Sequence, residues 1–257
     1  MPFLSSIKIC DTPFTKVRLG GEADGGYVVL DEICRKCDLL YSYGVERDVS
    51  FEKSFVEKYK TKAILFDHTI EEFPEEHQNF LFVREGLAPY KSDTLDTLES
   101  HINRFGDAQH KTLKMDIEWG EWAVFEDLSS DLIKSFDQII CEFHIIPVEY
   151  KGSHSPYFTG FHKSIYKKIN QLLLDKYKTV LDKLQRNHDV YHVHVNNSLG
   201  HNLINGERIP NLVELSFVNK KYIEKAVVSK TTFPINGLDC PNKTDRPDIL
   251  DIEWNPN

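Results

Sequence analysis

Hydrophobic residues along the chain fall into short runs that alternate with amphipathic stretches. The runs predict β-strands at residues 39–43, 62–67, 79–87, 112–119 and 136–146. Apolar residues spaced by three or four positions predict helices from about residue 50, over 93–106, over 120–128 and over 161–187. Two further strands, 189–197 and 211–219, are separated by a loop that contains no helical pattern.

Strands that alternate with helices are typical of a mostly parallel sheet with helices on both faces, because each parallel connection needs a crossover segment. The last two strands lack such a crossover, so we expect them to pair antiparallel at one edge. Seven strands with this terminal hairpin are the layout of the α/β, Rossmann-like class I methyltransferases, which depend on S-adenosylmethionine (SAM). We therefore predict one such domain over residues 1–257, with 1–37 as an N-terminal cap segment and 221–257 as a C-terminal extension.

The composition is that of an ordinary globular protein, and it limits the partners. Of the 257 residues, 40% are hydrophobic and 28% are charged, and the formal net charge is -9. This charge argues against a nucleic-acid partner, since nucleic-acid-binding domains usually carry a basic face. No apolar run reaches the ~20 residues of a membrane span, and no secretory signal is recognisable. With five cysteines, an odd number, we expect a cytoplasmic protein with reduced thiols that acts on a small molecule, either as a monomer or as a homo-oligomer.

Two strand ends carry residues typical of a nucleotide-like ligand. The first strand ends at Gly44, within "YSYGVERDVSFE", and leads into the N-terminus of a helix. The next strand ends at Asp67, where a carboxylate can accept both hydroxyls of a ribose. Taken singly, the first feature also fits an ordinary turn, and Asp67 also fits a helix cap before "TIEEF". Together they favour a cofactor that contains a nucleoside.

Acidic residues and a histidine end the next two strands. Asp116 and Glu118 share strand parity, and so do Glu142 and His144. Because neighbouring parallel strands end at the same edge, we expect these side chains to meet. Asp116, Glu142 and His144 are ligand types that suit Mn²⁺ or Mg²⁺. The alternatives are a plain hydrogen-bonded pair, or His144 as a general base.

A histidine pair lies near the end of the chain, in "HVHVNN". The histidines alternate with valine, and such pairs are more often packed and hydrogen-bonded than catalytic. His194, Asn196 and Asn197 nevertheless suit a polyhydroxylated substrate, whose hydroxyls need paired donors and acceptors.

Several blocks together resemble a known family. "RLGGEADGGYVVL", "YSYGVERDVSFE", "LFDHTI", "LKMDIEWGEW", "IICEFHI", "HVHVNN" and "IPNLVELSFVNK" occur in order between residue 18 and about residue 220. They resemble the FkbM-type methyltransferases, and most closely the branch of methyltransferase-like protein 24. The resemblance implies a SAM-dependent O-methyltransferase. Bacterial members often methylate sugar hydroxyls in capsule and surface-glycan biosynthesis, and some are similar to enzymes that act on nucleotide-activated sugars such as GDP-heptose.

The resemblance also implies roles for individual residues. Gly44, Glu46 and Asp48 would line the amino-acid end of the donor, and Asp67 would hold its ribose. Glu85 and Gly86 would lie near the adenine. Asp116 would lie between donor and acceptor. Apart from these roles, Tyr27 is a further candidate for substrate binding. The family form of the fourth-strand block is nearer "DIEGAEW", so Trp119-Gly120 departs from it.

The expected chemistry is an in-line methyl transfer in which the protein takes a proton from a weakly acidic hydroxyl. We expect Asp116, Glu118 and His144 to be catalytic, with general-base assistance of roughly 10²–10⁴ in rate or with a divalent ion. One alternative is an NAD-linked sugar dehydrogenase or epimerase. The G-x-G-x-x-G fingerprint that such an enzyme carries after its first strand is missing, and neither Tyr59 nor Tyr177 has the lysine four residues later that a Tyr-x-x-x-Lys pair requires. The other alternative is an inactive methyltransferase-like binding module.

Overall fold

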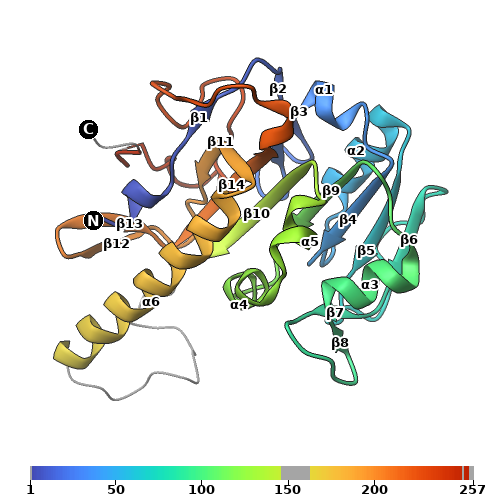
Figure 1. The fold of residues 1–257 in the computed structure, drawn as a ribbon, viewed down its shortest axis with the longest axis horizontal. Helices are drawn as coiled ribbons and strands as arrows, with labels where there is room; N and C mark the ends of the chain where they lie inside the picture. Colours follow the sequence, from blue (N-terminus) through green and yellow to red (C-terminus); the bar gives the residue numbers. More distant parts are fainter. Residues whose placement is uncertain (1, 146–162, 251, 255–257) are drawn as a thin grey trace.

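The computed structural model describes residues 2–145, 163–250 and 252–254 and is built around a sheet of seven strands (Figure 1). Across the sheet the order is β11 (His188–Val195), β14 (Leu212–Asn219), β10 (Gln138–His144), β9 (Lys111–Met115), β4 (Leu39–Tyr43), β5 (Lys62–Phe66) and β6 (Phe80–Val83). Parallel pairing joins five of these strands. The strand of this sheet that comes last in the sequence, β14, lies between its two pairing partners, β10 and β11, and is antiparallel to both. This is the Rossmann-like methyltransferase fold, and the predicted fold class, with its antiparallel edge pair β11–β14, is confirmed.

Alternating residues of each strand face two different layers. Tyr41 and Tyr43 belong to a core shared with α3 (Leu98–Phe105), α4 (Glu121–Asp127), α5 (Ser130–Lys134) and α6 (Lys163–Gln185). Leu40 instead packs into a second core with α1 (Asp31–Cys34) and α2 (Ser50–Tyr59). Burial on both faces explains why the strands read as nearly continuous apolar runs.

Several element boundaries differ from those predicted. Strand β9 ends at Met115, since its neighbour β4 leaves the sheet after Tyr43, the residue that pairs with Met115. The predicted strand 79–87 divides into β6 and the short β7 (Gly86–Leu87), which pairs with β8 (Leu95–Asp96). Helix α3 begins only at Leu98, because the Thr97 side chain accepts a hydrogen bond from Ser100 N and caps it.

The predicted loop between the last two strands of the sheet contains a hairpin of its own. Its strands are β12 (His201–Ile204) and β13 (Glu207–Pro210). Both turn residues, Asn205 and Gly206, have positive φ, of 53° and 85°, as a tight hairpin turn requires. Residues 146, 161 and 162, which the prediction assigned to a strand and a helix, lie outside the described residues.

Segments from both ends of the chain pack beside the β11–β14 edge (Figure 1). The N-terminal segment contains η1 (Leu4–Ser6) and the hairpin of β2 (Lys16–Leu19) and β3 (Tyr27–Leu30). Its strand β1 (Cys10–Asp11) pairs with β15 (Val227–Val228), which follows the 3₁₀ turn η2 (Lys220–Tyr222). Tyr191 on β11 and Ser216 on β14 both donate hydrogen bonds to Val28 O, which anchors the hairpin to the sheet.

None of the helices in the described ranges is both long enough and apolar enough to cross a bilayer.

Candidate active site

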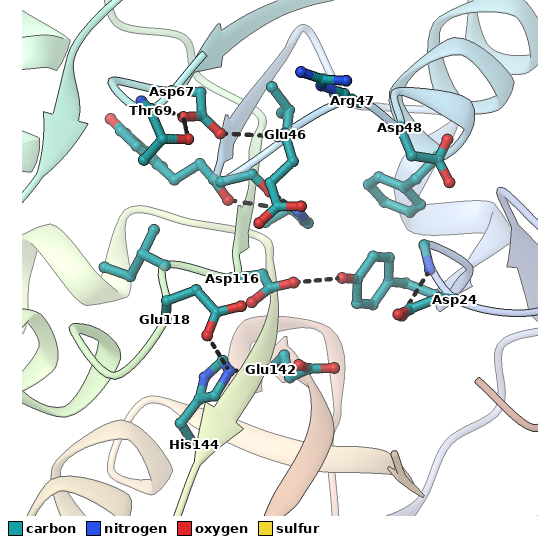
Figure 2. A pocket seen from close by; sticks show the side chains of 18 of the residues that line it. Asp24, Glu46, Arg47, Asp48, Asp67, Thr69, Asp116, Glu118, Glu142 and His144 are labelled. Atoms are coloured by element: carbon teal, nitrogen blue, oxygen red, sulfur yellow. Dashed lines mark hydrogen bonds and ion pairs between the residues drawn. The ribbon is translucent and has the colours of Figure 1, made fainter. Parts of the chain in front are cut away.

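A cavity of about 620 Å³ opens at the carboxyl ends of the central strands (Figure 2). This volume is within the usual range for small-molecule and cofactor sites. Its walls come from the loops that follow β4, β5, β9 and β11, and from the end of β10. The cavity therefore lies where the sheet order reverses between β4 and β9, as expected for this class of sheet.

The loop after β4 approaches the loop after β9 very closely at Gly44. Gly44 has a φ of 71°, and a Cβ at this position would lie 1.5 Å from the carbonyl oxygen of Asp116. Gly44 N donates to Phe66 O, and Asp116 N donates to Tyr43 O. Only glycine fits here, and its backbone lines the cavity.

Asp67, at the end of β5, is buried and holds the same loop. Its Oδ2 accepts a hydrogen bond from Glu46 N at 2.8 Å, and its Oδ1 accepts from both N and Oγ1 of Thr69. Burial raises the pKa of Asp67, but these hydrogen bonds outweigh burial and lower the pKa below its usual value. No helix starts after Asp67 in this described part of the chain, so it does not act as the helix cap considered as an alternative. An ionised carboxylate on the cavity wall remains available to accept hydroxyl groups.

A buried lysine, Lys114 on β9, lies beneath the loop. Its Nζ donates to Gly44 O at 2.7 Å and lies 5.3 Å from the centre of the Tyr27 ring. The side chain is 4% exposed and lines the cavity. Lys114 is not among the residues predicted from the sequence, although a lysine inside a predicted buried strand, between Leu113 and Met115, is a signal of a functional position.

Asp116 lies on the cavity wall directly after β9, with its carbonyl oxygen against Gly44. Its Oδ2 accepts a hydrogen bond from Tyr27 Oη at 3.2 Å, whereas its buried Oδ1 has no hydrogen-bond partner among the described residues. Burial raises the pKa of Asp116 to about 6; Lys114 and His144 oppose the rise, and nearby carboxylates add to it. A carboxylate oxygen without a partner in a cavity is well suited to accept a proton or a cation.

His144, at the end of β10, lies among three carboxylates (Figure 2 shows two of them, Glu118 and Glu142). Its Nδ1 is 3.1 Å from Glu121 Oε1, and its Nε2 is 3.3 Å from Glu118 Oε2 and 3.8 Å from Glu142 Oε1. Burial lowers the pKa of His144, but the hydrogen bonds with Glu118 and Glu121 outweigh it and raise the pKa to about 11. A protonated imidazole cannot take up another proton. The carboxylates around His144 therefore favour Asp116 over His144 as the general base.

Glu118 reaches this cluster by a route other than the predicted one. The strand ends at Met115, so strand parity does not place Asp116 and Glu118 on one face, and that part of the prediction is wrong. Glu118 and Trp119 instead form a turn in which both have positive φ, of 50° and 79°. This turn directs Glu118 towards His144.

The metal prediction has a geometric basis. One ligand atom each from Asp116, Glu142 and His144 lie within 4.8 Å of one another. Together with the unpartnered Asp116 Oδ1, this donor set fits Mn²⁺ or Mg²⁺ once His144 has lost its proton. The metal ion itself remains a prediction. A second group, Glu85, Asp96 and His101, is already neutralised by Lys91 and Arg104.

The structure brings most of the predicted residues to the cavity. Those on its wall are Tyr27, Gly44, Glu46, Asp48, Asp67, Gly86, Asp116, Glu118, Glu142, His144 and Asn196. Asn196 donates to Glu142 Oε2 at 2.9 Å, which fixes that carboxylate. The roles of these residues remain predictions.

Three predicted residues, Glu85, His194 and Asn197, do not line the cavity. Glu85, expected near an adenine, binds Arg104 and His101 instead. His194, expected to contact substrate, is buried between Glu214 and Asp248, with N···O distances of 3.3 and 3.2 Å. These partners account for the position of His194, because a buried ionisable side chain is stabilised by paired, hydrogen-bonded neighbours.

Asn197 likewise holds the chain itself. Its Nδ2 donates to the carbonyl oxygens of Lys243, Arg246 and Pro247, and its Oδ1 accepts from Lys243 N. It thereby fixes the segment that brings the Lys243 side chain to the cavity wall. The predicted site does not include Glu121, which is buried, accepts a hydrogen bond from Ile117 N and lies 3.1 Å from His144 Nδ1.

Comparison with known proteins gives the family. A family model described as a methyltransferase domain matches residues 9–181, more than half of the chain. The protein belongs to this methyltransferase domain family. The dehydrogenase or epimerase alternative is therefore wrong. The narrower FkbM-type assignment remains a prediction.

Solved structures with similar folds are distant. One is a fibrillarin/Nop5p complex, with 7% identity, a TM-score of 0.38 and coverage of 80% of this chain and 93% of that one. A second is a 16S rRNA (adenine(1408)-N(1))-methyltransferase mutant from Catenulisporales acidiphilia, with 9% identity, a TM-score of 0.35 and coverage of 80% and 98%. A third is the calicheamicin-biosynthesis methyltransferase CalO1 with SAH bound, with 10% identity, a TM-score of 0.30 and coverage of 71% and 49%. No curated protein matches the sequence.

Proposed function

We propose that this methyltransferase-family protein transfers a methyl group from SAM to a hydroxyl of a sugar. The acceptor would be a nucleotide-activated sugar resembling GDP-heptose, used in capsule or surface-glycan biosynthesis. The observation that carries the proposal is the position of Asp116, which joins the donor loop through its backbone and presents an unpartnered carboxylate oxygen.

The donor half is the wall that contains the glycine loop. Gly44 allows backbone to approach the amino-acid end of SAM, and Glu46 and Asp48 lie on the same loop. Asp67 is ionised and would accept the ribose hydroxyls, and Gly86 would lie against the adenine. When bound, SAM supplies an activated methyl group on a sulfonium. Lys114 keeps the loop in place by binding Gly44 O.

The acceptor half is the wall formed by the ends of β10 and β11. Asp116 Oδ1 would take the proton of the acceptor hydroxyl, while Tyr27 holds the other oxygen of the same carboxylate. Where an ion binds, Asp116 would instead be one of its ligands together with Glu142 and His144, and Mn²⁺ or Mg²⁺ would supply the Lewis acidity that lowers the pKa of that hydroxyl. Nε2 of His144, on the side of Glu142, would then bind the ion in place of Glu118, and Glu121 at Nδ1 would keep the ring oriented.

Charge on the cavity rim is compatible with a phosphorylated acceptor. The cavity is largely acidic, which suits a neutral hydroxyl at the centre but would repel phosphate. Arg47 and Lys243 are exposed and line the rim, and neither side chain has an ion-pair partner among the described residues. These two cations are suited to the phosphates of a nucleotide sugar.

Mass spectrometry of nucleotide sugars incubated with the protein and SAM, with and without Mn²⁺, tests the proposal. We expect a mass gain of one methyl group on GDP-heptose, and loss of that product in Asp116→Asn with unchanged binding of SAH in calorimetry. Normal turnover in Asp116→Asn would reject the assignment of the base. An unchanged rate after chelation and metal add-back would reject the metal. Absence of SAH binding in the wild-type protein would favour the inactive binding module.

The net charge of -9 supports a small-molecule acceptor over nucleic acid. That exclusion, a cytoplasmic location and the oligomeric state remain predictions.

A further inference from the structure

Trp119 is a large aromatic side chain left partly exposed beside the acidic cluster. It lines the cavity and is 40% exposed. The ring centres of Trp119 and His144 are 4.9 Å apart at an interplanar angle of 52°, so the indole lies beside the acceptor half and not beside Asp67 or Gly86. The indole N–H has no hydrogen-bond partner among the described residues. The buried Trp122, in contrast, donates its N–H to His144 O.

The backbone at Trp119 is unfavourable for tryptophan. Trp119 has a φ of 79° and the preceding Glu118 has a φ of 50°, so two adjacent residues have a left-handed backbone conformation. Such positions destabilise a fold by roughly 1–3 kcal/mol each and are concentrated at functional sites. The Glu118 side chain gains a hydrogen bond with His144, whereas the exposed part of the Trp119 ring gains no protein contact. A conformation that is unfavourable and still exposes an apolar ring indicates that the ring has a ligand.

We propose that Trp119 is a stacking platform for the sugar ring of the acceptor and so determines which acceptors the protein takes. This inference rests on the proposed function. The CH groups on one face of a pyranose form an apolar surface that packs on an indole ring, and its hydroxyls need polar partners around that contact. Glu118, Asn196 and Ser198 line the same cavity and supply such partners. Asp116 precedes the turn and receives the proton of the hydroxyl that reacts.

Two substitutions separate ring stacking from simple filling of space. Trp119→Phe keeps a flat aromatic ring, whereas Trp119→Leu keeps apolar bulk without one. With GDP-heptose as acceptor, we expect KM to rise about threefold in Trp119→Phe and about tenfold or more in Trp119→Leu. In both variants kcat and the Kd for SAH should stay within about twofold of wild type. Tyr90→Leu is the matched control, since Tyr90 is 59% exposed and does not line the cavity, and it should leave KM unchanged.

Inhibition by GDP alone, which carries the nucleobase but no sugar to be methylated, distinguishes stacking of the nucleobase on Trp119 from stacking of the acceptor sugar. We expect the inhibition constant of GDP to be the same in wild type and Trp119→Leu. A parallel rise of that constant with KM would place the nucleobase on the ring and overturn the inference. Equal KM values in the Phe and Leu variants, or a fall in kcat without a rise in KM, would also overturn it. Failure of the wild-type protein to bind SAH or to methylate GDP-heptose would be a failure of the proposed function, which the wild-type control shows separately.

Discussion

Replacement of Gly44 by alanine tests the close contact on which the donor loop and Asp116 both depend. The new Cβ would lie 1.5 Å from the Asp116 carbonyl oxygen, at a φ of 71°. An ordinary contact between carbon and oxygen is no shorter than about 3.3 Å. The two loops must therefore separate by about 2 Å.

Two effects add up in this variant. The left-handed conformation destabilises an alanine by roughly 1–2 kcal/mol, and overpacking destabilises the fold by about 1–3 kcal/mol more. The sum, about 2–5 kcal/mol, reaches at most the lower end of the typical 5–15 kcal/mol of a folded domain, so the variant should remain folded. A displacement of 1 Å at a catalytic group lowers the rate by about 10²-fold, so we expect kcat/KM to fall by at least about that factor.

Gly237→Ala is the matched control. Gly237 has a φ of 78°, but an added Cβ would meet nothing within 4 Å, so only the backbone term applies. Urea unfolding gives the stability of both variants, and methyl transfer to GDP-heptose gives their rates. The difference between the variants is the effect of the contact with Asp116, because both have the same backbone effect. A Gly44→Ala protein whose stability and turnover match those of Gly237→Ala would refute the reasoning.

Further predictions concern other contacts of the site and the core. Glu121→Gln removes the charge that faces His144 and should lower the methyl-transfer rate by about 10–100-fold without changing the Kd for SAH; an unchanged rate would show that His144 does not need this partner. Asn197→Ala frees three carbonyl oxygens of the 243–247 segment and should make trypsin cleave after Lys243 much faster than in wild type, whereas an unchanged digestion pattern would contradict the anchoring role. Burial lowers the pKa of His188 from 6.5 to about 4. The unfolded state therefore binds more protons between these values, and the folded state should lose about 3 kcal/mol as the pH falls from 7 to 4. The free energy of unfolding of His188→Gln should lose less over the same range, and identical slopes would reject this assignment.

The sheet was predictable because its strands are buried on both faces and are separated by amphipathic helices. Strand ends were less predictable: alternation of polar and apolar residues continues through Asp116, Ile117 and Glu118, but pairing stops where β4 leaves the sheet at Gly44. The β12–β13 hairpin had a clear signal in Asn205-Gly206, which the prediction of a plain loop passed over.

The candidate site was predictable as far as it depends on strand ends. Asp116, Glu142 and His144 meet because β9 and β10 are parallel neighbours. The fate of His194 was not predictable, since its partners Glu214 and Asp248 come from residues distant in the sequence. Pattern alone cannot show which polar side chains are already satisfied by such contacts.

The cavity wall is divided between two successive stretches of the chain. Apart from Tyr27 and the rim residue Arg47, residues up to Gly86 form the side assigned to the donor, and residues from Glu142 onwards form the side assigned to the acceptor. Only β9 and the turn after it serve both sides. Acceptor choice can thus diverge from β9 onwards while the earlier stretch stays intact, and chimaeras of related proteins joined between α3 and β9, which take Trp119 from the later parent, should inherit the acceptor of that parent.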